Sequence, residues 1–133
     1  MILGIGLDLC EIERMKRAVE KPRFVDRVFT AAEAARIRAA GETRAAEIAA
    51  GLFAAKEAVS KALGTGFAGF GPWDIEITPD GAGRPLCALR GGALARARAL
   101  AAPNRPRVWV SVTHEKGMAA ATAIIEGEEQ CTP

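Results

Sequence analysis

Two carboxylates and a lysine stand in apolar surroundings where a charged side chain needs a partner. Asp8 ends the segment Gly4-Ile-Gly-Leu-Asp8, and Glu57 and Lys61 lie four residues apart in an apolar stretch. A buried carboxylate without a cation, a metal or N–H donors is costly. Side chains four apart share one face of a helix. Mg²⁺ binds one or two carboxylates together with water and substrate phosphates, and lysine neutralises the same phosphates. These residues therefore favour magnesium-assisted phosphate chemistry.

Each of these residues also has a simpler interpretation. Asp8 could cap a helix that begins near Glu11, and the segment alone favours this cap. Glu57 and Lys61 could form an ordinary surface pair worth a few tenths of a kcal/mol. The apolar neighbours on the same helix argue against a plain surface pair: Phe53, Ala54, Ala58, Val59 and Leu63.

A third polar group closes a predicted strand at Ser111-Val-Thr113-His114, which contains the only histidine of the chain. A single histidine excludes a His-rich zinc site, and the Cys/His spacing of zinc sites is absent. No GxSxG motif supports a serine hydrolase, and Gly64-Thr-Gly66 is too short for a P-loop. The three groups together fit phosphate-ester chemistry better than hydrolysis, redox chemistry or nucleic-acid binding.

The chain is long enough for one domain, 1–133, with the composition of a soluble globular protein. A deep cleft for a large ligand is easier to build between subunits than within so small a chain. The three cysteines form no CxxC pair, and neither a signal peptide nor a membrane-spanning run is present. We therefore expect a cytoplasmic protein without membrane association, and an oligomer.

The formal net charge is only +2, but basic residues gather early in the chain. Such a cluster could face nucleic acid, an anionic membrane or an acidic protein, or it could be a solvated helix face. Its members are Arg14, Lys16, Arg17, Lys21, Arg23 and Arg27.

The elements that must position these residues follow from periodicity and from helix-capping and turn signals. The pattern predicts a short buried strand over 2–9, a helix over 11–19, a helical turn over 22–29, and a helix starting at the capping box of Thr30 and Glu33. The strongest helix prediction is 43–63, followed by a glycine-rich loop over 64–72.

The second half of the chain is dominated by strand patterns. Strands are expected over 73–78, 85–89, 108–113 and 118–126, with a helix over 93–101 and a frayed tail over 128–133. This order predicts an α+β fold, with a small antiparallel sheet packed against one long and several short helices.

These motifs have a family resemblance that covers almost the whole chain. The segments are Ile5 to Arg14, Phe29-Thr-x-x-Glu33, Phe53 to Gly66, Trp73 to Ile77, Gly83-Arg-Pro85 and Val110 to His114. They resemble the holo-[acyl-carrier-protein] synthase family of 4′-phosphopantetheinyl transferases. The specific signature is the Gly-x-Asp at Asp8 followed by Lys-Glu-x-x-x-Lys ending at Lys61.

The resemblance implies the 4′-phosphopantetheinyl transferase fold and a Mg²⁺ ion held by Asp8 and Glu57. Lys61 is then the phosphate partner, and coenzyme A is the co-substrate. The residues expected to line the coenzyme site are Ser60, Gly64, Thr113 and His114. A carrier serine attacks the β-phosphate, and adenosine 3′,5′-bisphosphate leaves. Glu57, directly or through a metal-bound water, is the candidate general base.

The resemblance also gives the basic cluster a partner. Acyl carrier proteins are acidic, so Arg14 and Arg23 are expected to dock the carrier, in support of fatty acid biosynthesis. A homotrimer with active sites between subunits is implied.

Two positions depart from the family pattern. Leu52 stands where arginine often occurs, so that Arg44 or Arg90 would have to replace it. Cys10 stands where larger relatives have a third carboxylate, which indicates the small two-carboxylate branch.

Three other functions remain open from the sequence. The same chemistry could act on a polyketide or type I synthase carrier domain. The chain could also be a non-catalytic module that binds coenzyme A or a carrier. A nucleic-acid-binding module rests only on the basic cluster, and we expect no nucleic-acid partner.

Overall fold

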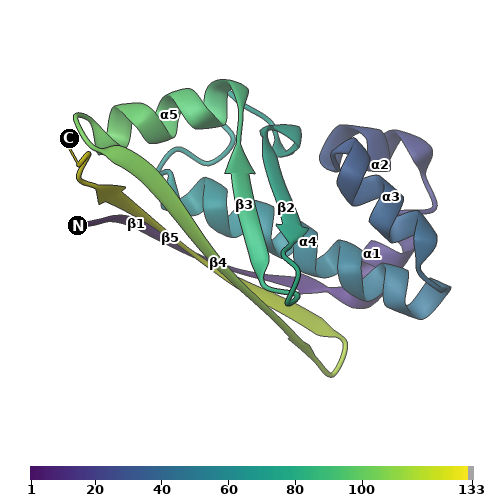
Figure 1. Ribbon diagram of the computed structural model, residues 1–133. Coiled ribbons are helices and arrows are strands. Elements are labelled where there is room, and N and C mark those ends of the chain that lie inside the picture. The colour runs from purple at the N-terminus through teal and green to yellow at the C-terminus, as the bar shows by residue number, and fades with distance from the viewer. Residues whose placement is uncertain (132–133) are drawn as a thin grey trace.

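The computed structural model describes residues 1–131 and has five strands and five α-helices in that range (Figure 1). The first half of the chain holds β1 (Ile2–Glu11), α1 (Ile12–Ala18), α2 (Pro22–Val28), α3 (Ala31–Ala39) and α4 (Glu42–Ala62). A short 3₁₀ turn, η1 (Pro72–Asp74), leads into β2 (Ile75–Pro79) and β3 (Pro85–Leu89). The chain continues through α5 (Gly91–Ala101), β4 (Arg105–Glu115) and β5 (Met118–Glu128).

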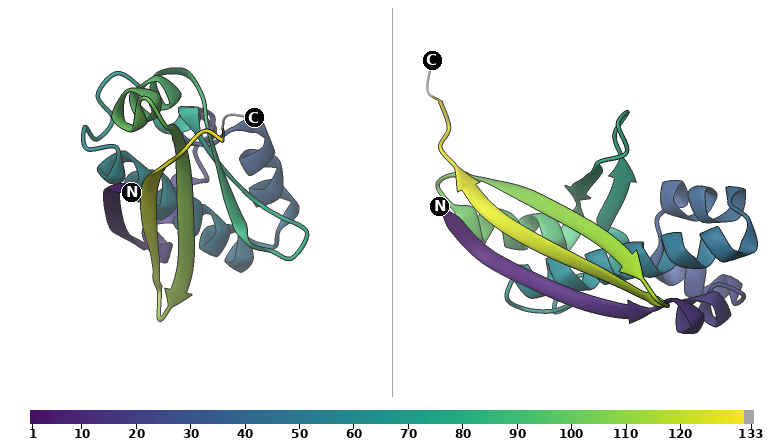
Figure 2. Two further views of the ribbon diagram at one scale, coloured as in Figure 1. Left: turned by 60° about the vertical axis from the view of Figure 1, so that its left-hand side comes forward. Right: turned by 90° about the horizontal axis from the view of Figure 1, so that it is seen from below.

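The main sheet is antiparallel, with β5 in the middle and β1 and β4 at its two edges. Asp8 lies opposite Ala121 of β5, which in turn lies opposite Val112 of β4. The view from below in Figure 2 shows these three long strands side by side with the helices behind them. β2 and β3 form a separate antiparallel hairpin.

The long helix α4 packs on the inner face of the main sheet and contacts all three of its strands. Gly4 and Gly6 of β1 make this packing possible. A Cβ atom added at Gly4 would lie 1.9 Å from the Ala62 carbonyl oxygen, and one at Gly6 would lie 1.7 Å from that of Ala58. Only glycine lets the two backbones approach so closely, which brings Asp8 next to the last turns of α4.

The prediction that β1 is a buried strand is wrong for its second face. Gly6 and Cys10 face the core, but Ile5, Leu7 and Leu9 are 67%, 59% and 63% exposed. The reason is that α4 covers only the glycine side of an edge strand, and no element of residues 1–131 covers the other side. β1 therefore presents an apolar stripe to the outside.

The helix predictions are confirmed within one or two residues at most ends. Thr30 and Glu33 form the predicted capping box at the start of α3. The predicted final strands are longer than expected, because β4 begins at Arg105 and β5 reaches Glu128. The predicted tail lies partly in β5 and partly outside the described residues.

The α+β class is confirmed, with two small sheets in place of the single one expected. Among the described residues, no helix combines the length and apolar character needed to cross a bilayer.

Candidate functional site

Asp8 and Lys61 meet where β1 runs beside the last turns of α4. The Lys61 Nζ lies 2.9 Å from Asp8 Oδ1 and also donates to the Leu7 carbonyl oxygen at 3.0 Å. The Lys61 side chain is half exposed, so the contact opens onto solvent. The alternative that Asp8 is a helix cap is wrong, because the N-cap of α1 is Glu11, without a side-chain bond.

Glu57 lies one turn before Lys61 and completes what we call the open cluster, defined as Asp8, Glu57 and Lys61. Partial burial raises the pKa of the Glu57 carboxyl, and the charge of Asp8 raises it further, while Lys61 and Arg14 act in the opposite direction. The two carboxylates thus repel each other across the β1–α4 contact, and a cation between them would relieve that repulsion. Lys61 forms its ion pair with Asp8 and not with Glu57, so the interpretation of Glu57 and Lys61 as a simple surface pair is wrong.

The donor set of the open cluster fits a magnesium ion. Within residues 1–131 no three His, Cys, Asp or Glu side chains gather in a metal-binding group, so the protein supplies two carboxylates at most here. Two carboxylates leave room for the water and phosphate oxygens with which Mg²⁺ completes its octahedron. Cys10 lies nearby but is buried, and burial raises the pKa of its thiol to about 11. The thiol is therefore protonated at neutral pH in the metal-free protein, and Mg²⁺ prefers oxygen ligands to sulfur.

A pocket of about 250 Å³ lies on the β4 side of α4 and is called the β4 pocket here. Arg36 and Arg44 bring positive charge to it, and His114 contributes its imidazole ring. Glu47 also lines the pocket, and its Oε2 lies 3.1 Å from Arg44 Nη1 and 3.8 Å from His114 Nε2. The remaining wall is mostly apolar and comes from α4, the β2–β3 hairpin and β4: Ile48, Gly51, Leu52, Ile77, Thr78, Pro79, Gly83, Pro85 and Val112.

The open cluster and the β4 pocket lie on opposite edges of the main sheet. β1 and β4 are separated by β5, which places their backbones roughly 10 Å apart at the spacing of neighbouring strands. The pocket uses the first half of α4 through Gly51 and Leu52, whereas the cluster uses its last two turns. His114 is therefore not brought together with Asp8, Glu57 and Lys61 within one chain.

The other predicted coenzyme contacts have different settings. Ser60 lies in the core at 1% exposure, and its hydroxyl donates to the Glu57 carbonyl oxygen at 2.7 Å, which favours a packing role. Gly64 follows α4 with a φ of +83° and lies exposed beside Lys61. Thr113 is exposed on the outer face of the main sheet, opposite to the face of His114. Contacts of Gly64 and Thr113 with coenzyme A stay predictions.

The position of the missing family arginine is now defined. Leu52 is buried and lines the β4 pocket, and Arg44 lines the same pocket. Arg90 instead donates to the Trp73 carbonyl oxygen and lies 3.9 Å from Glu76, away from the pocket lining. Of the two suggested substitutes, only Arg44 is placed to act in the pocket.

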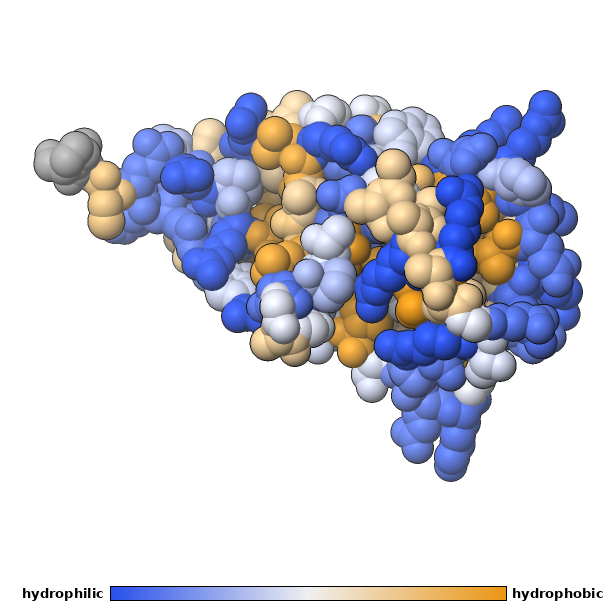
Figure 3. Space-filling model, turned by 45° about the vertical axis from the view of Figure 1, so that its right-hand side comes forward, coloured by the Kyte–Doolittle hydropathy of each residue, from blue (hydrophilic) through white to orange (hydrophobic). Residues whose placement is uncertain are grey.

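The basic cluster lies on α1 and α2 and on the turn between them. Arg14 and Arg23 are exposed, and Arg14 is close enough to Glu57 to affect its pKa. Lys16 lies 3.6 Å from Glu42, and Asp26 lies 4.0 Å from Arg38. On the face seen in Figure 3, patches of apolar surface lie between hydrophilic residues.

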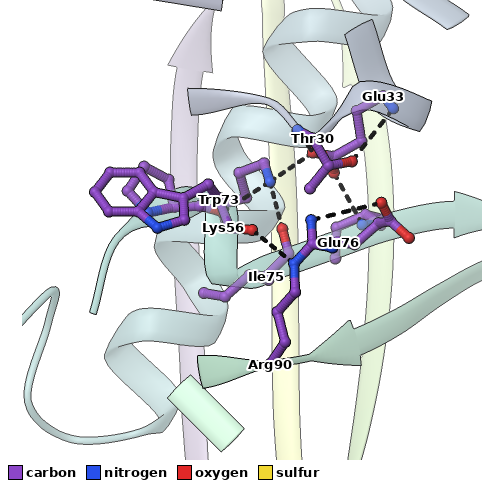
Figure 4. Close-up of polar contacts among 9 residues, drawn as sticks. Thr30, Glu33, Lys56, Trp73, Ile75, Glu76 and Arg90 are labelled. Carbon is purple, nitrogen blue, oxygen red and sulfur yellow. Dashed lines mark hydrogen bonds and ion pairs between the residues drawn. The ribbon is translucent and has the colours of Figure 1, made fainter. Parts of the chain in front are cut away.

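One polar network was not predicted from the sequence. Lys56, the neighbour of Glu57, is fully buried and lies with its Nζ 2.7 Å from Glu33 Oε1, and Glu33 is buried equally well. The available signal was the capping-box glutamate, whose second role inside the core has no sequence signature. Figure 4 shows the two side chains pointing toward one another from α4 and the start of α3.

Comparison with known proteins gives one consistent result. Residues 4–122 match the model of the 4′-phosphopantetheinyl transferase superfamily. The chain is 47% identical to a holo-[acyl-carrier-protein] synthase of Solidesulfovibrio magneticus, over 96% of this chain and all of the relative. It is 43% identical to one of Clostridium acetobutylicum, over 95% and 98% of the two chains.

A solved structure extends the similarity to three dimensions. The holo-(acyl-carrier-protein) synthase of Bacillus anthracis, in complex with coenzyme A (3′,5′-ADP), superposes with a TM-score of 0.80 at 32% identity. The superposition covers 96% of this chain and 99% of that one.

Proposed function

The chain belongs to the holo-[acyl-carrier-protein] synthase family of 4′-phosphopantetheinyl transferases, and we propose that it transfers 4′-phosphopantetheine from coenzyme A to a serine of apo acyl carrier protein. The observation that supports this activity most directly is the open cluster. Two mutually repelling carboxylates beside one half-exposed lysine form a site that is short of positive charge. A divalent cation would supply that positive charge, and the bound cation and Lys61 would then attract a pyrophosphate.

Asp8 of β1 and Glu57 of α4 are the residues proposed to hold Mg²⁺, because they are the two carboxylates of the cluster and lie close enough for the charge of Asp8 to raise the pKa of Glu57. The bound ion would neutralise charge on the pyrophosphate of coenzyme A. Lys61 has three donors, of which two are used by Asp8 and the Leu7 carbonyl. Its exposed ammonium group is thus available to a phosphate oxygen.

The transfer needs a group that accepts the proton of the carrier serine. The serine oxygen forms a bond to the β-phosphorus of coenzyme A, and the bond from that phosphorus to the bridging oxygen breaks. Adenosine 3′,5′-bisphosphate leaves, and the serine proton goes to the Glu57 carboxylate, directly or through water. Glu57 is the candidate for this role because its carboxylate belongs to the open cluster and lies close to Arg14 on the proposed docking surface.

We propose that the β4 pocket of one subunit binds the adenosine end of a coenzyme A molecule. The pyrophosphate of that molecule would lie at the open cluster of a neighbouring subunit. The arginines and His114 of the pocket suit a phosphate, and its apolar wall suits a base. Within one chain the pocket and the cluster lie on opposite edges of the sheet, so a second copy would complete the site. The exposed stripe of Ile5, Leu7 and Leu9 supports burial of this face in an assembly, for which we propose a homotrimer.

The carrier is proposed to dock on α1 and α2 beside the open cluster. Arg14 and Arg23 are exposed there, and an acidic carrier would be steered toward them. Arg14 lies close to Glu57, so the docked serine would arrive at the cluster. We place this activity in cytoplasmic fatty acid biosynthesis.

The test mixes the protein with apo acyl carrier protein, coenzyme A and Mg²⁺, with and without a chelator. Mass spectrometry should show the carrier gaining one phosphopantetheine only when free metal is present. A panel with polyketide and type I carrier domains distinguishes the carriers. Binding of coenzyme A without any mass gain on any carrier would contradict the transferase and leave a binding module.

A further inference from the structure

Lys56 has a complete set of partners inside the protein. Its ammonium group contacts Glu33 and donates to the Pro72 carbonyl oxygen at 2.9 Å and to that of Ile75. Three donors thus meet three acceptors, and none remains for a ligand. The Lys56 side chain has no exposed surface. It is therefore not a phosphate-binding lysine, although it lies only five residues before Lys61.

Glu33 is satisfied in the same way. Its Oε1 accepts from the Thr30 N–H at 2.8 Å as well as from Lys56, and its Oε2 accepts from the Ile77 N–H at 2.9 Å. Through these contacts the pair joins the start of α3, the middle of α4, η1 and β2 (Figure 4). No buried side-chain nitrogen or oxygen in residues 1–131 is left without a partner.

Stability alone is a poor reason for such a pair. Burying two charges carries a large desolvation cost, and replacing a buried ion pair by apolar side chains is often neutral or stabilising. Apolar packing would, however, lack the directional bonds that fix how α3, α4 and β2 sit against each other. The pair is thus better suited to setting geometry than to adding stability.

The elements joined by the pair are those that build the coenzyme site. Arg36 of α3, Gly51 and Leu52 of α4 and Ile77 of β2 line the β4 pocket. On the same helix, Glu57 follows Lys56 directly. Successive residues of a helix are about 100° apart around its axis, so a rotation of α4 that moves Lys56 also swings Glu57 away from Asp8.

We propose that Glu33 and Lys56 are positioning residues for coenzyme A binding, which lock the rotation of α4 so that Glu57 faces Asp8 while α3 and β2 enclose the β4 pocket. This proposal rests on the proposed function, in which coenzyme A binds at the open cluster and in the β4 pocket. The two residues touch neither coenzyme nor carrier. They act through Glu57, Arg36 and the wall of the pocket.

The test replaces the charges but keeps the volume, in the double variant Glu33→Gln with Lys56→Met. The single glutamine oxygen can accept from one of the two backbone N–H groups that the carboxylate serves, that of Thr30 or that of Ile77, and methionine fills the path of the lysine stem. Calorimetry with coenzyme A and Mg²⁺, without carrier, should show affinity weakened by about tenfold, within the range typical of residues that act on a site without touching its ligand. The KM for coenzyme A should rise more than that for the carrier.

Two further variants separate positioning from stability. Ile125→Ala opens a cavity in the fully buried part of β5, outside both places of the site. It should lower the melting temperature at least as much as the double variant, yet bind coenzyme A like the wild type. Glu33→Asp keeps both charges but shortens the contact, and it serves if the double variant does not fold.

Each outcome decides one question. Wild-type protein that neither binds coenzyme A nor modifies a carrier contradicts the proposed function, whatever the variants do. Active wild-type protein, with a double variant or Glu33→Asp that binds coenzyme A with unchanged affinity, overturns the positioning role and leaves the pair structural. Equal weakening in Ile125→Ala also overturns it, because general loosening would then explain the effect.

Discussion

Two ionic groups one residue apart on α4 have opposite designs. Lys56 and Glu33 are completely buried and find every partner within the chain. Glu57, Asp8 and Lys61 form the open cluster, in which the half-exposed lysine pairs with Asp8 and the charge of Asp8 raises the pKa of Glu57. In the first group, which we call the closed pair, the two charges neutralise each other and every hydrogen-bonding group has a partner. The second is left incomplete on the side that faces solvent.

The difference shows how one helix can serve structure and chemistry at once. A closed network fixes α4 so that the open one does not have to contribute to holding the fold. The open cluster can then keep its repulsion and its unfilled coordination until a cation and a phosphate arrive. This division predicts that a variant removing one charge of the closed pair lowers stability as well as coenzyme A binding, whereas variants of the open cluster act on transfer alone.

The largest expected effect comes from breaking the closed pair on one side. Lys56→Met leaves the Glu33 carboxylate buried without its cation, which should destabilise the protein by about 3–5 kcal/mol. Urea unfolding followed by circular dichroism measures this loss. The matched control is Lys16→Met, which makes the same substitution at a solvent-exposed pair with Glu42 and should cost about 1 kcal/mol or less. Similar losses in both variants would erase the distinction between the two groups.

Glu57→Gln tests the open cluster. It removes one of two proposed metal ligands while keeping the shape of the side chain, and transfer should fall by roughly 10²–10³-fold, as for loss of one electrostatic stabiliser. Unfolding should stay within about 0.5 kcal/mol of the wild type, as for a substitution with no buried partner. The carrier mass-shift assay and urea unfolding give the two numbers. Full transfer activity would remove Glu57 from the metal site.

The sequence was informative where local rules decide the structure. The capping box at Thr30 and Glu33 and the composition around Glu57 placed α3 and α4 correctly, because helix capping and propensity act over a few residues. The spacing of Glu57 and Lys61 put them on one face. Their union with Asp8 was predicted from family resemblance, because a contact between residues 53 apart leaves no local pattern.

The sequence was silent where partners come from distant elements. The sequence around Glu33 predicts a capping residue, and no nearby residue indicates that Glu33 also contacts Lys56 and Ile77. The apolar letters of β1 read as a buried strand, whereas the close approach of α4 to Gly4 and Gly6 turns Ile5, Leu7 and Leu9 outward. Likewise, whether His114 meets the cluster depends on strand order, which the sequence alone does not supply.

Gly6→Ala should separate the two sides of the open cluster without touching its charges. The new Cβ would lie 1.7 Å from the Ala58 carbonyl oxygen, so β1 or α4 must shift and move Asp8 from Lys61. We expect a loss of about 1–3 kcal/mol, in the range of overpacked cores, together with weaker transfer. Gly81→Ala is the control, since a Cβ there meets nothing within 4 Å. Unchanged stability and transfer in Gly6→Ala would mean that the contact tolerates a methyl group.

The smallest effect, a change in how stability depends on pH, tests how the closed pair keeps its charges. Burial lowers the pKa of Lys56, and Glu33 opposes that shift. In Glu33→Gln the opposing charge is gone, so the folded-state pKa of Lys56 falls further below the unfolded value of about 10.4. Between these two values the unfolded chain binds a proton that the folded protein lacks.

Stability therefore rises with pH across that window, by at most about 1.4 kcal/mol per pH unit for a single proton. Glu33→Gln should be least stable, relative to the wild type, below the folded-state pKa of Lys56, and should recover as the pH approaches 10. Urea unfolding from pH 6 to pH 10 measures the trend, and Glu128→Gln, on the exposed pair with Arg107, should run parallel to the wild type. Parallel curves for Glu33→Gln as well would mean that Glu33 does not set the charge of Lys56, because losing its partner would then leave proton binding unchanged.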